Sequence, residues 1–284
     1  MEKIIGDVMF SALKKGKQFA ITCDTGAIGT VHSVFDKALN IQLGKTDNLL
    51  TLLHHGIDIM EATCTIAPTV TPFHQRAKVG ANVIFTQNVV YIANIPFCAG
   101  IQTAQTWASL SHMPYKTNLT YQQLAQKCVN IATYLNKHDT NQHLWPADAT
   151  TFDPVGYIGL GTGLTPSGDD FLAGMLYAMH FFEEMYSTMV PLLAQVEKDV
   201  MSNINNTNQI SRHFLRYALA NKPSQNTESF LTALFGENAQ ELTQAIDKKI
   251  AYGASSGVDE LQGCIFGLTA SIEAEGCNGH VYNN

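Results

Sequence analysis

The spacing of hydrophobic and polar positions changes partway along the chain. Up to about residue 110, short runs rich in Val, Ile, Phe and Thr are separated by turn residues such as Asp24-Thr25-Gly26, a pattern that favours β-strands. No helical period lies between these runs, so parallel βαβ units are not expected. The runs predict strands at residues 18–23, 29–35, 38–43, 59–66 and 82–93, with a helix before them at residues 4–14.

From about Tyr121 the apolar positions follow a helical period. Residues 121, 124, 128, 131 and 135 are apolar and lie on one face of a helix. We therefore predict an α+β protein, with a β-rich domain (a small barrel or sandwich) at residues 1–115 and a mainly α-helical domain at residues 116–284. Further helices are expected at residues 168–186, 191–204, 210–220, 227–235, 238–251 and 257–273.

Composition narrows the class of protein. Only 14% of the 284 residues are charged, against roughly 25% in an average domain, which predicts a buried interface and an oligomer. The net charge is -7 and no Lys/Arg run exists, so a nucleic-acid partner is not expected. The longest apolar run, residues 171–182, is too short to span a bilayer, and the N-terminus does not resemble a secretory signal. Six scattered cysteines without a CxxC pair are typical of a reduced, cytoplasmic protein.

Residues 159–170, GLGTGLTPSGDD, are the strongest candidate site. Glycine allows positive φ and close approach of a ligand, and Ser167 suits a helix N-cap. Such a loop directs backbone N–H groups and the positive end of a helix toward one point, which favours an anion. Capping alone does not require so many glycines. The candidate anion-binding residues here are Gly161, Gly163, Thr165, Ser167 and Gly168.

Two familiar phosphate loops do not fit this segment. A Walker A loop needs Lys after its last glycine, where this chain has Asp169. A Rossmann fingerprint needs GxGxxG within a βαβ unit, whereas the spacing here is GxGxG without that context. A standard nucleotide-binding loop is therefore not predicted.

The start of the following helix is repeated later in the chain. The segment from Ser167 and the segment from Ser256 share the pattern S-G-x-D-x-L-x-G-x-[L/I], and small residues follow at helical spacing in both. Our hypothesis is that the two helices pack closely, with both N-termini facing one pocket. This adds Ser256, Gly257 and Asp259 to the anion-binding candidates. The later copy is equally compatible with an ordinary capped helix start.

Asp169 and Asp170 are the candidate catalytic residues, although carboxylates oppose anion binding. They are tolerable if they accept backbone N–H groups, position a substrate amide, or hold a divalent cation such as Mg²⁺ that bridges to the anion. Arg212 suits a bidentate anion clamp or a plain surface role. The histidines lack metal-ligand spacing, so no metal ligand is assigned.

The chain resembles a known family at these residues. GLGTGLTPSGDDFLAG is similar to the signature of the AllH family, and so are the later segment from Ser255 to Asp259 and the early residues 32–35 and 38–40. The resemblance covers most of the chain, and the three segments occur in the same order as in the family. The glycine-rich signature is fairly specific, whereas the other two segments are weak on their own.

The resemblance implies a component of an oxamate carbamoyltransferase of anaerobic allantoin breakdown. There, oxalurate and phosphate give oxamate and carbamoyl phosphate, and the family member acts with an FdrA-like and a YlbE-like subunit. The substrates are small anions, which suits paired helix N-termini. The Ser-Thr-Arg-Thr type phosphate loop of ordinary carbamoyltransferases is missing. The alternative is a non-catalytic anion- or nucleotide-binding regulatory or scaffold subunit.

Overall fold

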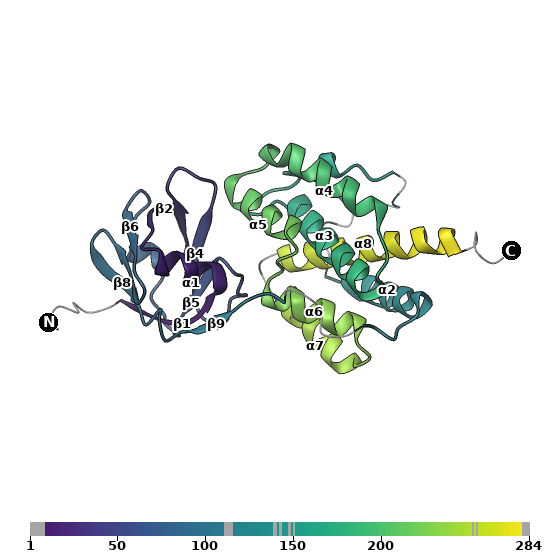
Figure 1. The fold of residues 1–284 in the computed structure, drawn as a ribbon, viewed down its shortest axis with the longest axis horizontal. Coiled ribbons are helices and arrows are strands. Elements are labelled where there is room, and N and C mark those ends of the chain that lie inside the picture. The colour runs from purple at the N-terminus through teal and green to yellow at the C-terminus, as the bar shows by residue number, and fades with distance from the viewer. Residues whose placement is uncertain are drawn as a thin grey trace. The chain divides into compact units, whose positions relative to one another are not determined.

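The computed structural model describes residues 9–110, 116–138, 141, 144–146, 149, 151–251, 253 and 255–279, with side chains up to residue 276. The chain forms two compact units, Met1–Ser109 and Leu110–Asn284 (Figure 1). The first unit holds all the strands of the described chain, and the second contains helices α2 to α8. This confirms the α+β class.

The first unit is a barrel. Its sheet runs in the order β5-β4-β3-β2-β6-β7-β8-β1-β9, and pairing of β5 with β1 closes the first eight strands while β9 adds to the edge of β1. Closure removes most exposed strand edges. The strands are β1 (Phe10–Gly16), β2 (Ile28–Val34), β3 (Ala38–Leu43), β4 (Leu49–Leu53), β5 (Thr63–Ile66), β6 (Asn82–Phe85), β7 (Val89–Ile92), β8 (Ile95–Ala99) and β9 (Gln105–Trp107).

Two predictions at the start of this unit are wrong. Residues 18–23 form the helix α1 (Lys17–Asp24), not a strand. Its buried residues Phe19, Thr22 and Cys23 follow a helical spacing, but the helix is too short for this period to be recognised in the sequence. The predicted helix at residues 4–14 is contradicted where the chain is described, because β1 begins at Phe10 and pairs with β5 and β8. Residues 4–8 lie outside the described residues.

Two other predicted strands differ in extent. The run at residues 82–93 is a hairpin of β6 and β7, because Thr86 turns the chain by binding Val89 through its hydroxyl group. The run at residues 59–66 becomes a strand only at Thr63. Strands β4, β8 and β9 were not predicted; β4 and β8 are short and largely apolar, whereas β9 begins with the polar residues Gln105 and Thr106.

The helices of the second unit agree closely with prediction. Local signals explain this agreement: Thr120 and Gln123 form a capping box before α2, and Ser224 caps α6. One apolar core joins α2 to α8. The helices are α2 (Tyr121–Leu135), α3 (Ser167–Tyr186), α4 (Pro191–Asn203), α5 (Gln209–Leu219), α6 (Gln225–Phe235), α7 (Ala239–Ile250) and α8 (Ser256–Gly279), with 3₁₀ turns at Phe73–Gln75, Pro154–Tyr157 and Ile204–Asn206.

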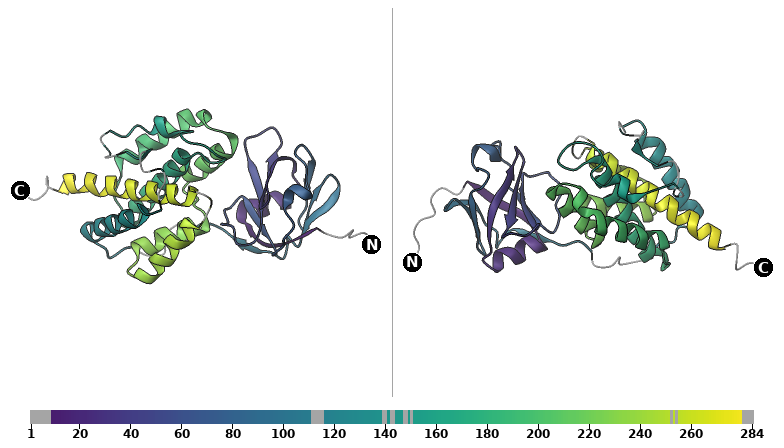
Figure 2. Two further views of the ribbon diagram at one scale, coloured as in Figure 1. Left: turned by 180° about the vertical axis from the view of Figure 1, so that it is seen from behind. Right: turned by 90° about the horizontal axis from the view of Figure 1, so that it is seen from above.

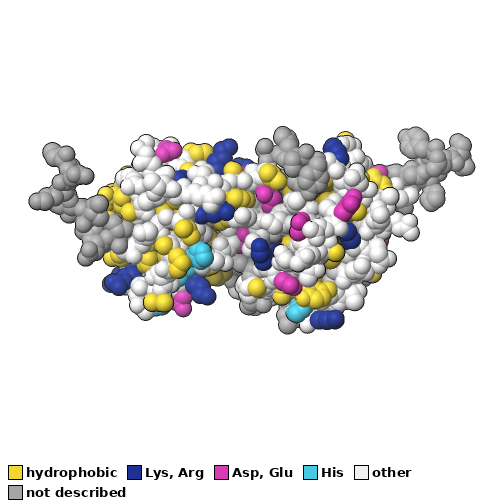
Figure 3. All heavy atoms as spheres, turned by 90° about the horizontal axis from the view of Figure 1, so that it is seen from below, with side chains coloured by type: hydrophobic (Ala, Val, Ile, Leu, Met, Phe, Trp, Pro, Cys, Tyr) yellow, Lys and Arg dark blue, Asp and Glu magenta, His cyan; other side chains and the backbone are white. Residues whose placement is uncertain are grey.

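The surface carries few charges, as the composition requires. On the face drawn in Figure 3, basic and acidic side chains of the coloured residues are scattered singly among uncharged atoms. Within the described chain, no helix has the length and apolar character needed to cross a membrane. The five described cysteines are buried and unbridged, and Cys277 lies outside the described side chains.

Candidate functional site at the start of helices α3 and α8

Helices α3 and α8 pack against each other reciprocally. A Cβ added to Gly174 of α3 would lie 1.9 Å from the carbonyl oxygen of Glu260, and one added to Gly263 of α8 would lie 1.9 Å from that of Phe171. Gly174 and Gly263 are equivalent in the repeated motif, and so are Phe171 and Glu260. The two helices are therefore related by a local pseudo-two-fold axis. Figures 1 and 2 show α8 (yellow) beside α3 in each view.

The N-termini of the two helices meet at one end of this pair. Thr165, just before α3, lies with its hydroxyl oxygen 3.1 Å from that of Ser256, the first residue of α8. The side-chain amide of Asn141 donates both to Ser167 Oγ and to Asp259 Oδ1, each at 3.0 Å. The hypothesis that the repeated segments pack together is confirmed. Asn141 was not anticipated, because it stands in a polar loop without any motif.

Asp170 points from the first turn of α3 toward the start of α8. Its carboxyl group is hydrogen-bonded by the hydroxyl groups of Ser256 and Thr165. Burial raises its pKa well above the usual value, and the nearby acids Glu260 and Asp259 act in the same direction. Asp259 holds the equivalent position on α8 and is fully buried. The site therefore favours a neutral Asp170 more than water does.

Asp169 has a different role from its neighbour. Its Oδ1 accepts the backbone N–H of Gly159 at 2.8 Å, and its Oδ2 accepts the hydroxyl group of Thr207 at 2.5 Å. Both oxygens are thus engaged by the protein and tie the glycine-rich loop to the segment before α5. Burial raises the pKa of Asp169, while these two hydrogen bonds oppose the shift. The two candidate catalytic acids are not equivalent.

The glycines of the loop also differ in what they do. The Gly168 amide donates to Leu160 O at 2.8 Å, so it is used inside the protein, and a Cβ there would lie 2.1 Å from Tyr157 O. Gly161 and Gly163 have φ of 107° and 100°, a region that favours glycine. A Cβ on Gly163 would meet none of the described atoms within 4 Å, whereas one on Gly161 would lie 3.0 Å from the backbone nitrogen of Ser167.

The start of α3 differs from the prediction in one detail. Pro166 is the N-cap, with extended backbone, and Ser167 is already helical. Ser167 was expected to cap the helix, but its hydroxyl group instead accepts from Asn141. On α8, Gly257, the residue after Ser256, is buried.

Arg212 of α5 binds the segment that precedes its own helix. Its Nη1 donates to Thr207 O at 2.9 Å. Thr207 is also bound by Asp169, so both charged residues hold this segment. The structure thus gives Arg212 a contact within the protein and does not test its expected role as an anion clamp.

A buried ion pair supports the start of α8. Lys249 Nζ lies 2.6 Å from Glu260 Oε2 and donates to Thr227 Oγ1 at 3.0 Å, while Thr227 donates to Glu260 Oε1 at 2.5 Å. Lys249 is 1% exposed. This triad was not predicted from the sequence, because a Lys on an amphipathic helix is usually at the surface.

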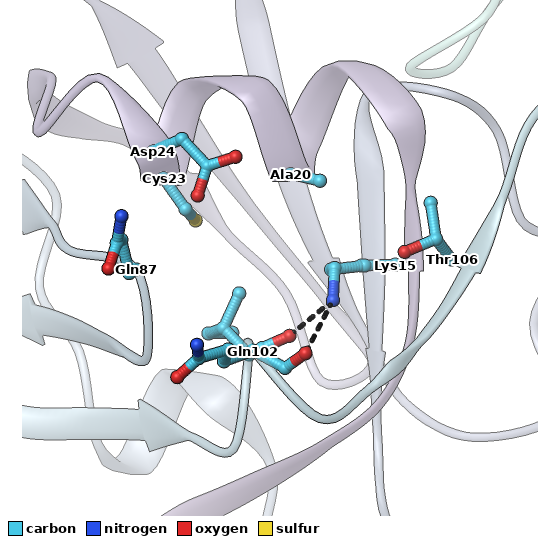
Figure 4. Close-up of a pocket in the computed structure, with 8 residues that line it drawn as sticks. Lys15, Ala20, Cys23, Asp24, Gln87, Gln102 and Thr106 are labelled. Atoms are coloured by element: carbon cyan, nitrogen blue, oxygen red, sulfur yellow. Dashed lines mark hydrogen bonds between the residues drawn. The ribbon is translucent and has the colours of Figure 1, made fainter.

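The barrel contains a cavity of about 300 Å³ beside Lys15 (Figure 4). The ammonium group donates to the carbonyl oxygens of Ile101, Ala104 and Gln102 at 2.5, 2.9 and 3.3 Å. These bonds use all three N–H donors of the lysine. Burial raises the pKa of the Cys23 thiol in the cavity wall to about 12, which makes it a poor nucleophile. We read this region as a structural clamp.

Metal-ligating side chains do not gather in the described part of the chain. No group of three or more His, Cys, Asp and Glu residues there has an arrangement that would hold a metal ion. The paired acids of α3 and α8 stand among hydroxyl groups and a side-chain amide instead. The arrangement supplies hydrogen-bond donors and acceptors.

Fold and site together define a two-unit α+β protein with a closed barrel and a helical unit built around a pseudo-symmetric helix pair. Residues 157–268, which include the glycine-rich loop and both helix starts, match the family described as oxamate carbamoyltransferase subunit AllH. Residues 5–111 match the AllH family N-terminal domain. The chain belongs to the AllH family of oxamate carbamoyltransferase subunits. No solved structure matches it.

Proposed function

We propose that the chain binds a small anionic substrate of carbamoyl transfer where α3 and α8 begin. The reaction is the one that the family name implies: oxalurate and phosphate exchange with oxamate and carbamoyl phosphate. The chain acts in it as one subunit of a larger enzyme, with FdrA-like and YlbE-like subunits as its partners. The cytoplasm is the expected compartment for such catabolism.

One observation carries this proposal: the two copies of the motif converge at their N-termini. Hydroxyl groups of Thr165, Ser167 and Ser256 and the positive ends of two helices approach one point. Small anions bind at helix N-termini through such neutral donors. Convergence of two similar ends suits a ligand with an oxygen-rich end, such as a phosphate or an α-oxo carboxylate.

The acids of the site are compatible with an anion under this arrangement. Asp169 is held by Gly159 and Thr207 away from Ser256, and Asp170 has a raised pKa. A neutral carboxyl group does not repel an anion, and it keeps an oxygen that accepts a hydrogen bond. Gly163 leaves the loop backbone open to close approach of a ligand, because a Cβ there would meet none of the described atoms within 4 Å.

The test is isothermal titration calorimetry with phosphate, carbamoyl phosphate and oxalurate, on the chain alone and with its partner subunits. Ser256→Ala should weaken binding about five- to ten-fold, because one hydrogen bond to a charged ligand is lost. Ser229→Ala is the matched control, since Ser229 is exposed on α6 and binds only its own helix. Gly163→Val should abolish binding, because a β-branched side chain strains a backbone with a φ of 100° and fills the space in front of the loop, and circular dichroism checks that the variant stays folded.

The outcomes separate the candidate functions. Unchanged affinity in both Ser256→Ala and Gly163→Val would remove the site from this end of the helix pair. Heat with a ligand but no turnover in the full assembly would favour a regulatory anion-binding subunit. No heat with any ligand, with or without partners, would favour a scaffold.

A further inference from the structure

The carboxyl group of Asp170 is the unusual feature of the site. It extends from α3 to the first residue of α8 and is hydrogen-bonded by the hydroxyl groups of Ser256 and Thr165. Its second oxygen, Oδ2, is buried and has no hydrogen-bond partner among the described residues. Buried carboxyl oxygens are nearly always satisfied in folded proteins. The position therefore offers an acceptor that the described protein leaves unused.

The charges around Asp170 do not supply the missing partner. Those that act on it are Glu260 and Asp259, which are both acidic. Glu260 is itself paired with Lys249, so that cation is already engaged. A donor for Asp170 is therefore best supplied by a ligand that carries N–H groups beside its anionic end.

The site has two parts, the hydroxyl groups at the helix N-termini and the unpartnered Oδ2 of Asp170. A ligand that binds to both parts needs two chemically different ends. An oxygen-rich anionic end suits the hydroxyl groups and helix N-termini. A primary amide end carries N–H donors for the unused carboxyl oxygen. A carbamoyl group joined to an anion has both ends, whereas an acetyl group joined to the same anion lacks the N–H donors.

We infer that Asp170 is the specificity-determining residue of the site, accepting a hydrogen bond from the NH₂ of a carbamoyl ligand and so selecting carbamoyl over acyl groups. This inference rests on the proposed function and assigns one side chain within it. No covalent step is involved. Asp169 cannot substitute for Asp170, because both of its oxygens are held by Gly159 and Thr207.

The test compares carbamoyl phosphate with acetyl phosphate, in which CH₃ replaces NH₂ at nearly the same size. The wild-type chain, with its partner subunits, should bind carbamoyl phosphate about ten-fold or more tightly than acetyl phosphate, since the analogue leaves the buried acceptor unpaired. Asp170→Ala and Asp170→Asn should bring the ratio of the two dissociation constants toward one. Asp247→Asn, an exposed acid on α7, is the control and should keep the wild-type ratio.

The possible results distinguish failure of this inference from failure of the proposed function. Equal affinity of the wild type for both ligands would overturn the inference but leave the anion site standing. A carbamoyl preference that survives in both Asp170 variants would move the selectivity to another residue. Failure of the wild type to bind either phosphate would overturn the proposed function itself. Circular dichroism of each variant checks that it is folded.

Discussion

Gly174 and Gly263 hold equivalent places on the two central helices, and each lies against a backbone carbonyl of the other helix. A Cβ at either position would stand 1.9 Å from that oxygen, which the packing cannot accommodate without separating the helices. Gly174→Ala and Gly263→Ala should each lower the free energy of unfolding by about 1–3 kcal/mol or more. Urea denaturation measures this.

Gly276 provides the matched control for that pair. It lies on the exposed part of α8, and a Cβ there meets none of the described atoms within 4 Å. Gly276→Ala should leave stability unchanged or raise it by up to about 1 kcal/mol, because Ala favours the helix. Equal behaviour of all three variants would contradict the reciprocal packing.

Asp169 should behave as a structural residue. Asp169→Ala removes two acceptors and leaves the Gly159 amide and the Thr207 hydroxyl group without their partner. We expect a loss of about 2–3 kcal/mol in the free energy of unfolding, measured by thermal or urea denaturation. A variant with wild-type stability would show that this tie does not hold the loop.

Asp170 should destabilise the fold at neutral pH. Its pKa is raised well above the usual value, first by burial and then by Glu260 and Asp259. In the unfolded chain it ionises near pH 4, so above that pH the unfolded state loses its proton while the folded state keeps it. The free energy of unfolding is therefore not reduced by Asp170 below about pH 4, and it falls as the pH rises from there toward the pKa of Asp170 in the folded protein.

Asp170→Asn removes that penalty because Asn does not ionise. The variant should have a higher Tm than the wild type at pH 7, and the difference should shrink as the pH approaches 4. Scanning calorimetry across this range checks it. A difference that stays constant with pH would show that the carboxyl group ionises equally in both states.

The buried pair of Lys249 and Glu260 should be costly to break. Lys249→Met leaves the Glu260 carboxylate without its cation, which should lower the free energy of unfolding by about 3 kcal/mol. The double variant with Glu260→Leu should recover much of the loss, since both charges are then absent. Lys248→Met, at an exposed position, is the control. Additive losses in the double variant would exclude coupling within the pair.

Local signals in the sequence were sufficient for much of the helical unit. The period of α2 was read directly from the sequence, and the caps at Thr120 and Ser224, which the structure shows, act within one turn of the helices they start. The paired motif was also readable, because small residues one turn apart, Gly174 and Ala178 in one helix and Gly263 and Gly267 in the other, mark a close helix contact. The short elements of the barrel unit were harder to predict from the sequence. Helix α1 has only eight residues, too few for its helical period to be distinguished from the alternating pattern of a strand.

The order of a β-rich and an α-helical unit, the approximate helix bounds and the pairing of α3 with α8 could be predicted from the sequence alone, because hydrophobic period and the spacing of small residues act over a few residues. The folded structure was needed to see the closure of the barrel by β1 and β5, the different roles of Asp169 and Asp170, and the contacts of Asn141 and Lys249. Those features depend on side chains and strands far apart in the chain. Their burial, partners and pKa arise only when folding brings them together.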